Sequence, residues 1–247
     1  MNGGFVDLVI EPPLWFIVSA IFAIITIYFI NKYKKIGAEA RPFILGLVLF
    51  IGSFTIARTI ETIRRYYIGS YYDIIDSNFT LIGANLILRL CYYIIAWAGI
   101  TIFYFVFEKH IMKKGMQKNT RYILTFCSAA EGFFSCLLYF TAAAAWVLYC
   151  VIILFFIVVF FPIIFFLYLV KMAISREQKI AWVIVSLGFL LALLGVMGDL
   201  PEASLIVTQY FGVPFLPPAF IHYGTPILQA VGATLLGIGF ATIYKVV

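Results

Sequence analysis

Four ionisable residues inside long apolar stretches are the residues of this chain best suited to chemistry: Arg58, Glu61, Arg89 and Glu131. On insertion scales, an ionised side chain at the centre of a bilayer costs about 2.5–3.5 kcal/mol, so each of these groups needs a partner or water. The planar guanidinium of arginine matches carboxylate and phosphate groups through paired hydrogen bonds. These residue types therefore predict a site for a small anionic or zwitterionic ligand, with Arg89 as its counter-charge.

The spacing of these residues puts them well inside a bilayer. Arg58 and Glu61 are three residues apart and share one face of a helix, and Arg65 follows four residues later on the same stripe. At the helical rise, Arg89 lies about 12 Å from the outer edge of its apolar stretch, and Glu131 lies about 14 Å from the inner edge of its own. We expect these side chains to converge in the outer half of a helix bundle.

Neighbouring residues complete the predicted site. Tyr92 and Tyr93 follow Arg89 by one helical turn, and two further polar residues stand at the outer ends of later apolar stretches. The expected pocket faces outward and has aromatic walls. Its predicted ligand-binding residues are Arg58, Glu61, Arg89, Tyr92, Tyr93, Glu131, Asp199 and His222.

Two alternatives to ligand binding remain open for the buried charges. In the first, Arg89–Glu131 and Arg58–Glu61 are ion pairs that fix the register of the helices, and no ligand binds. In the second, Glu131 belongs to a path for protons or ions across the membrane.

The sequence offers little for catalysis or for binding a metal. Its two histidines, His110 and His222, form no metal-ligating pair, and no nucleophile motif is present. The four cysteines lie in apolar stretches without Cys-x-x-Cys spacing, which predicts packing roles rather than disulfides or zinc ligands. We therefore expect no enzyme activity, no metal and no cofactor.

Membrane-spanning helices must position these residues. The chain is 64% hydrophobic and 11% charged, and its apolar runs approach the length that spans about 30 Å of hydrocarbon. Lipid cannot satisfy exposed backbone amides, so each run should be a helix. We predict an all-α integral membrane protein, a single domain of seven transmembrane helices over residues 1–247. The predicted spans are Leu14–Asn31, Pro42–Thr62, Leu81–Phe107, Tyr122–Phe140, Ala144–Val170, Ile180–Gly198 and Pro226–Tyr244.

The distribution of basic residues predicts the orientation of this bundle. Thirteen of the 17 basic residues share one side if the run from Tyr122 to Val170 is two helices with a turn near Thr141. The N-terminus is then outside and the C-terminus inside, and we expect the cell membrane as the location. The net charge of +6 is accounted for by topology and by contact with anionic lipid, so the lipid bilayer is an expected partner and nucleic acid is not.

Two outer connections carry distinctive residues. Arg64 and Arg65 begin a tyrosine-rich connection after the second span, which predicts an aromatic belt at the lipid headgroups. The apolar stretch from Asp199 to Thr225 predicts a surface helix or a cap over the bundle. Asn78-Phe79-Thr80 matches the glycosylation sequon.

Two features within the spans concern helix packing. Pro162 removes one hydrogen bond in the middle of the fifth span, which predicts a kink. Ala233, Gly237 and Ala241 are spaced by four residues in the seventh span, and they predict a small-residue stripe that a neighbouring helix approaches closely.

Three short segments carry a resemblance to a known family. They are Ala40-Arg41-Pro42-Phe43 before a long apolar helix with Glu61 near its end, Leu90-Cys91-Tyr92-Tyr93, and Phe103-Tyr104-Phe105. In these segments, about a quarter of the chain, the sequence resembles the seven-helix sensor modules that precede bacterial and archaeal histidine kinases. No kinase follows here, so the resemblance implies a stand-alone sensor that signals to a separate cytoplasmic partner protein.

The topology alone is also similar to that of the opsins and the G-protein-coupled receptors. An opsin needs a lysine in the middle of its seventh span to bind retinal, whereas the lysine of this span, Lys245, stands at its inner end. We therefore do not expect retinal. The favoured prediction is a receptor-like or sensor-like protein with a polar pocket in its outer half. The alternatives are a transporter of small solutes, ions or protons, and a non-catalytic structural membrane subunit.

Overall fold

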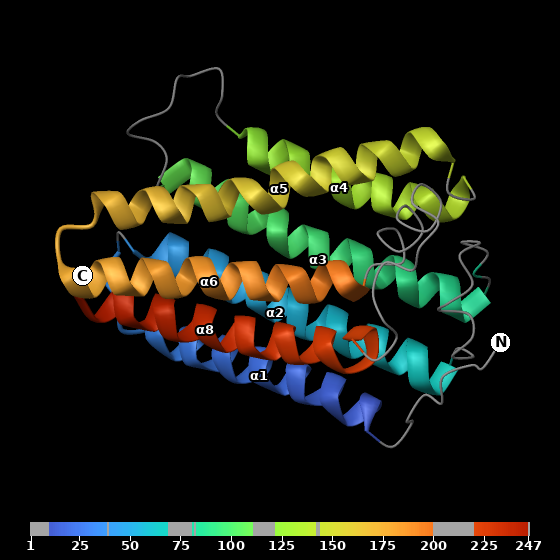
Figure 1. Ribbon diagram of the computed structural model, residues 1–247, viewed down its shortest axis with the longest axis horizontal. Helices are drawn as coiled ribbons and strands as arrows, with labels where there is room; N and C mark the ends of the chain where they lie inside the picture. The colour runs from blue at the N-terminus through green and yellow to red at the C-terminus, as the bar shows by residue number, and fades with distance from the viewer. Residues whose placement is uncertain are drawn as a thin grey trace. The chain divides into compact units, whose positions relative to one another are not determined.

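The computed structural model describes residues 10–38, 40–68, 81, 83–110, 122–141, 144–199 and 220–246. Helices make up nearly all of this part of the chain (Figure 1). They are α1 (Glu11–Tyr33), α2 (Arg41–Ile63), the π-helix η1 (Arg64–Ile68), α3 (Gly83–His110), α4 (Ile123–Phe140), α5 (Ala145–Met172), α6 (Arg176–Asp199), the π-helix η5 (Phe220–Gly224) and α8 (Thr225–Val246).

Seven helical segments of the described chain are long and apolar enough to cross a membrane. This confirms the predicted all-α fold and the number of predicted spans. The predicted turn near Thr141 is also confirmed, because Thr141 is the C-cap of α4 and α5 begins at Ala145. Insertion into a membrane and the side on which each terminus lies stay predictions.

The start of α6 differs from the prediction by one turn. The sequence predicted a start at Ile180, but the helix begins at Arg176 because Ser175 and Gln178 form a capping box. The Ser175 hydroxyl accepts a hydrogen bond from the Gln178 N–H at 3.1 Å, and Gln178 Oε1 accepts one from the Ser175 N–H at 3.5 Å. These bonds satisfy backbone donors that the first turn of a helix otherwise leaves open.

The described chain forms two compact units, and each is described here by itself. Unit 1 comprises residues 1–21 and 159–247, and unit 2 comprises residues 22–158. The organisation of the chain as a single domain stays a prediction.

Close packing of α2 against α3 builds the core of unit 2. Gly99 of α3 provides the space for this approach, since a Cβ at that position would collide with the Ser53 side chain of α2 and lie 3.3 Å from the Leu49 carbonyl oxygen. One turn further along α3, the rings of Phe50 and Phe103 stack at 5.2 Å between centroids. Small residues let two helices approach closely enough to hold polar groups between them.

Glu108, near the end of α3, fixes the start of α4. Its carboxylate accepts hydrogen bonds from the Leu124 N–H at 2.8 Å and the Thr125 N–H at 3.1 Å, and from the Thr125 hydroxyl at 2.6 Å. A carboxylate at this position satisfies open backbone donors and complements the positive end of the helix dipole. The buried Glu108 therefore holds α3 and α4 in register.

The proline in α5 is accommodated by a side chain from another helix. α5 continues as one helix through Pro162, which has no N–H to donate to the Val158 carbonyl four residues earlier. The buried Tyr104 hydroxyl of α3 donates a hydrogen bond to that carbonyl at 2.5 Å. In an apolar environment, a freed backbone carbonyl needs such a substitute donor.

In unit 1, α6 and α8 pack backbone against backbone through glycines. A Cβ on Gly232 of α8 would lie 2.3 Å from the Ala192 nitrogen of α6, and one on Gly188 of α6 would lie 2.7 Å from the Leu236 nitrogen. Gly232 and Gly239, two turns apart on α8, make this approach together with Gly188 and Gly195 of α6. The predicted stripe of Ala233, Gly237 and Ala241 against a neighbouring helix stays a prediction.

Candidate functional site

The carboxylate of Glu61 is the centre of a buried group of arginines in unit 2. Its Oε1 accepts hydrogen bonds from Arg64 Nη2 at 2.8 Å, from Arg65 Nε at 3.0 Å and from Arg89 Nη1 at 2.6 Å. Its Oε2 accepts one from Arg64 Nε at 2.9 Å. Arg64 thus holds Glu61 in the bidentate geometry that makes arginine–carboxylate pairs strong.

Local helix geometry explains how two of these arginines reach the same carboxylate. Arg64 and Arg65 follow Glu61 by three and four residues, the two spacings that bring side chains together on a helix surface. They also begin the π-helix η1, a wider turn that occurs frequently at functional sites. The sequence predicted that Arg64 and Arg65 belong to a belt at the headgroups, but both are buried in the structure. Tyr66 and Tyr67 also lie in η1, whereas residues 69–80 of that connection, including Asp73, Asp76 and the sequon, lie outside the described residues.

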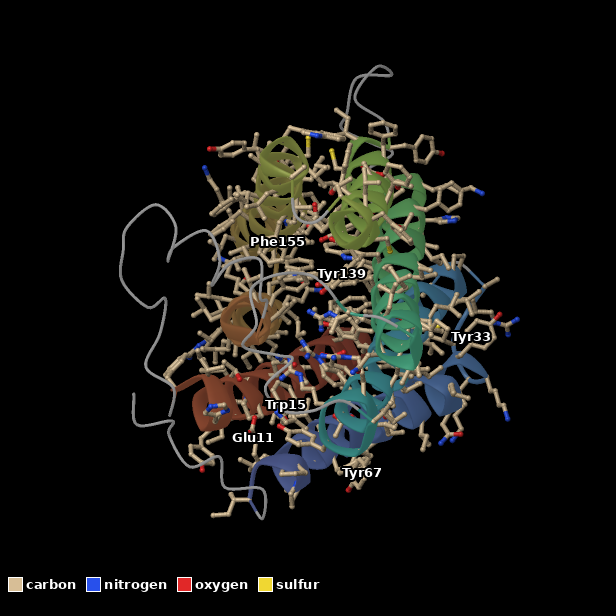
Figure 2. All side chains as sticks on the ribbon, turned by 90° about the vertical axis from the view of Figure 1, so that its right-hand side faces the viewer. Glu11, Trp15, Tyr33, Tyr67, Tyr139 and Phe155 are labelled. Carbon is tan, nitrogen blue, oxygen red and sulfur yellow. The ribbon has the colours of Figure 1, made fainter. Side chains whose placement is uncertain are left out.

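Arg89 of α3 uses each of its nitrogens for a different partner. Nη1 donates to Glu61, Nε donates to the Tyr139 hydroxyl of α4 at 2.9 Å, and Nη2 donates to the Tyr93 hydroxyl at 2.9 Å. Tyr139 is labelled in Figure 2. This guanidinium therefore connects α2, α3 and α4, and its orientation is fixed from three directions.

Aromatic rings cover the guanidinium groups. The ring of Tyr92 has Arg58 at 5.4 Å and Arg89 at 5.1 Å from its centroid, and the ring of Tyr93 has Arg89 at 4.7 Å. These distances are within the range of cation–π attraction, which strengthens when the cation is removed from water. The aromatic walls that the sequence predicted around Arg89 are thus present.

We call Arg58, Glu61, Arg64, Arg65 and Arg89 the arginine cluster. The relative exposures of its arginines are 1%, 3%, 7% and 3% in chain order, and that of Glu61 is 2%. Among the described residues, this cluster therefore holds four positive side chains and one negative side chain. The formal charges of these five side chains sum to +3, and all five are buried.

Glu131 is buried on α4, but its backbone lies at a different level from that of Arg89. Its neighbour Gly132 packs against Trp97 of α3, where a Cβ would lie 2.7 Å from the Trp97 Cβ. Arg89 contacts Tyr139, eight residues further along α4, which corresponds to about 12 Å at the helical rise. The structure pairs Arg89 with Glu61, a pairing that the sequence did not predict.

The other two predicted site residues belong to unit 1. Asp199 is the last residue of α6, and its side chain is outside the described part of the structure. His222 lies in η5, with its Nδ1 3.1 Å from Oε2 of Glu11 at the start of α1. The structure thus brings five of the eight predicted residues, Arg58, Glu61, Arg89, Tyr92 and Tyr93, into one set of contacts in unit 2. The ligand-binding role of all eight residues stays a prediction.

Arg64 and Tyr139 were missed from the sequence, whereas Arg65 was placed on the same stripe as Glu61. Arg64 carries a usable signal, because its spacing from Glu61 matches one helix face, provided that the helix is extended past Thr62. Tyr139 carries no such signal, since its contact with Arg89 joins residues that are 50 positions apart. A comparison of the chain with known protein families, curated proteins and solved structures found no match.

Proposed function

We propose that this chain is a seven-helix membrane receptor or sensor that binds a small anionic ligand at the arginine cluster. The single observation that carries the proposal is the convergence of the buried Arg64, Arg65 and Arg89 side chains on one carboxylate oxygen of Glu61. Each buried ion costs several kcal/mol to remove from water, and attraction to a partner of opposite charge must offset that cost.

An anion with several oxygens fits the chemistry of this cluster. Guanidinium groups recognise carboxylate and phosphate in planar, paired hydrogen bonds. The Tyr93 and Tyr139 hydroxyls accept hydrogen bonds from Arg89, and a tyrosine hydroxyl can act both as a donor and as an acceptor. The anchoring of Arg89 from three sides is the kind of preorganisation that lowers the entropy lost on binding.

The receptor or sensor role rests on the seven apolar helices together with the resemblance to histidine-kinase sensor modules. In such a protein, ligand binding changes the relative populations of two arrangements of the helices. The arginine cluster is suited to this role because it joins α2, α3 and α4 through one carboxylate and one guanidinium. A separate partner protein would receive the signal at the cytoplasmic ends of the helices.

A structural role for the cluster is the second candidate, and the contacts of Glu61 favour it. Both carboxylate oxygens already accept hydrogen bonds, and the Arg89–Glu61 pair joins α3 to α2. Buried charges of this kind can fix helix register without any ligand. This function requires that the remaining positive charge be balanced by carboxylates of the chain itself.

The two candidates are separated by thermal unfolding of the detergent-purified protein in a panel of anionic and zwitterionic metabolites. A ligand at 100 times its Kd stabilises the folded state by about 2.7 kcal/mol. We expect one compound to raise the Tm of wild type and of Arg176→Ala, an exposed-arginine control at the start of α6, but not that of Arg89→Ala. The structural role is supported instead if no compound shifts wild type while Arg89→Ala melts several degrees lower.

The double variant Asp73→Asn/Asp76→Asn tests whether the chain balances the cluster with its own carboxylates. If a ligand supplies the negative charge, the double variant should keep the wild-type Tm without ligand and the wild-type response to it. If the double variant has a lower Tm without ligand, or gains an affinity for anions, then these carboxylates balance the charge of the cluster. The ligand proposal would then fail.

A further inference from the structure

A line of polar side chains follows the buried face of α1 in unit 1. Glu11, Trp15 and Ser19 are each four residues apart, so they lie along one side of the helix, and all three are buried. Polar groups on a buried helix face need hydrogen-bond partners, since the surrounding apolar side chains offer none.

A matching line follows α8 and the turn before it. His222, Thr225 and Gln229 are spaced by three and four residues and share one side of the helix. Thr225 and Gln229 have no exposed surface. The Thr225 hydroxyl is satisfied, because it donates a hydrogen bond to the Ile221 carbonyl of its own helix.

The two lines meet at one end and run side by side. His222 Nδ1 and Glu11 Oε2 are 3.1 Å apart, and α1 and α8 run in the same direction (Figure 1). Figure 2 shows Glu11 and Trp15 on the side of α1 that is next to α8. Ser19 lies eight residues after Glu11, and Gln229 lies seven residues after His222. At the helical rise, both are therefore about 10–12 Å from the His222–Glu11 contact along their helices. Ser19 and Gln229 therefore lie at the same level of unit 1.

Ser19 and Gln229 share a second property. Both the oxygen and the nitrogen of the Gln229 amide, and the Ser19 hydroxyl, are buried without a hydrogen-bond partner among the described residues. The amide has two donor hydrogens and an acceptor oxygen, and the hydroxyl can donate and accept. Buried side-chain groups of this kind are almost always satisfied by protein or by ordered water.

α6 packs against Gln229 and Thr225 through Gly195. A Cβ on Gly195 would lie 2.6 Å from Gln229 Cγ and 2.8 Å from the Thr225 carbonyl oxygen. Gly195 therefore provides the space that the stem of Gln229 occupies. Packing of Gln229 Cγ against Gly195 thus restrains the side chain, while its amide nitrogen and oxygen have no hydrogen-bond partner among the described residues.

We propose that Gln229 and Ser19 form a second binding site, for a small uncharged molecule that both donates and accepts hydrogen bonds. Water has this chemistry, and so do uncharged solutes such as urea and glycerol. The absence of charge on both residues sets this site apart from the arginine cluster, and the proposal does not depend on the function assigned to that cluster.

Radiolytic hydroxyl labelling of the purified full-length protein tests the water form of the site, because a bound water produces radicals beside the side chains that it contacts. We expect oxidation of the buried Trp15, one turn before Ser19, to fall several-fold in Gln229→Met/Ser19→Ala. Oxidation of Trp182 on α6 should be equal in the two proteins. Gln229→Asn, which retains the amide, should keep the labelling of Trp15. If the double variant does not fold, Ser19→Ala alone replaces it with the same expectation.

Two thermal-unfolding series, one with added glycerol and one with low concentrations of urea, test whether the site binds an uncharged solute. Stabilisation of wild type beyond that of Gln229→Met would show that the site accepts the solute. Thr234→Val is the matched control, since that hydroxyl is exposed on α8 and bonds to its own helix. Equal Trp15 oxidation in wild type and variant, together with equal solute responses, would overturn the site.

Discussion

Arg89 and Glu61 form an ion pair at 2.6 Å between α3 and α2, although 28 positions separate them in the chain. Both side chains are almost completely buried. The same Glu61 oxygen also accepts hydrogen bonds from Arg64 and Arg65, so one atom connects the end of α2, the π-helical turn and α3. Removing either member of the pair therefore affects more than one helix contact.

Glu61→Gln should strongly destabilise the protein. The variant leaves three buried guanidinium groups without their shared negative partner, and breaking a buried pair costs about 3–5 kcal/mol. Unfolding of the purified protein in detergent measures the loss. Glu177→Gln, an exposed carboxylate in the first turn of α6, serves as the control and should change stability by much less. Equal stability of the two variants would contradict the central role of Glu61.

Arg89 and Tyr139 should be energetically coupled. Arg89→Lys keeps the charge but removes the fork that reaches three partners, and Tyr139→Phe removes the hydroxyl that accepts from Nε. Hydrogen bonds to charged groups contribute about 1.5–3 kcal/mol. A double-mutant cycle measured by unfolding should give a coupling of about 1 kcal/mol or more. Tyr149→Phe, on an exposed part of α5, should show none when combined with Arg89→Lys.

Tyr104→Phe should destabilise α5 from a distance. The variant removes the donor to the Val158 carbonyl, which Pro162 cannot replace. An unsatisfied buried acceptor costs about 1–3 kcal/mol. Hydrogen exchange of the amides around Val158 should become faster, while Tyr168→Phe, on an exposed part of the same helix, should leave it unchanged. Unchanged exchange in Tyr104→Phe would mean that the bond contributes nothing to the helix.

Gly232→Ala should force α6 and α8 apart. The added Cβ would overlap the Ala192 backbone, which cannot move aside as a flexible side chain can. Overpacking of this kind costs about 1–3 kcal/mol. Gly37→Ala is the matched control, because a Cβ there would meet no atom within 4 Å. The prediction fails if both alanine variants have the same Tm.

The predicted orientation can be checked with cysteine labelling after the four native cysteines are replaced. Lys35 lies between α1 and α2 on the side predicted to be cytoplasmic, and Tyr67 lies at the opposite end of α2; both are exposed. A membrane-impermeant maleimide should label Tyr67→Cys in intact cells and Lys35→Cys only after permeabilisation. The reverse pattern would invert the assigned topology.

Hydrophobic length was sufficient to predict the helices, because the requirement to span a bilayer leaves a strong signal in sequence. The turn at Thr141 was predictable from charge distribution even though the apolar run continues through it. The start of α6 was missed because the capping box of Ser175 and Gln178 is polar and lies outside the apolar run. Helix ends are determined by such local bonds, and hydropathy does not record them.

The candidate site was predicted in its residue types but not in its pairing. Because burying a charge costs free energy, Arg58, Glu61 and Arg89 were correctly identified as residues that need partners. The choice of Glu61 as the partner of Arg89 depends on the approach of α2 to α3 at Gly99, a tertiary contact with no local signature. Arg64 illustrates the same limit, because its chemistry suits a headgroup belt and a buried cluster equally well.

Tyr104 of α3 donates a hydrogen bond to the Val158 carbonyl of α5. Whether that carbonyl is satisfied therefore depends on how α3 is rotated about its own axis. Arg89 and Tyr104 stand on the same helix, 15 residues apart, or about 22 Å at the helical rise. A turn of α3 that repositions one of these side chains also repositions the other, since a helix rotates as a rigid rod. A rotation of α3 at Arg89 would in this way also disturb the hydrogen bond that Tyr104 donates to the Val158 carbonyl.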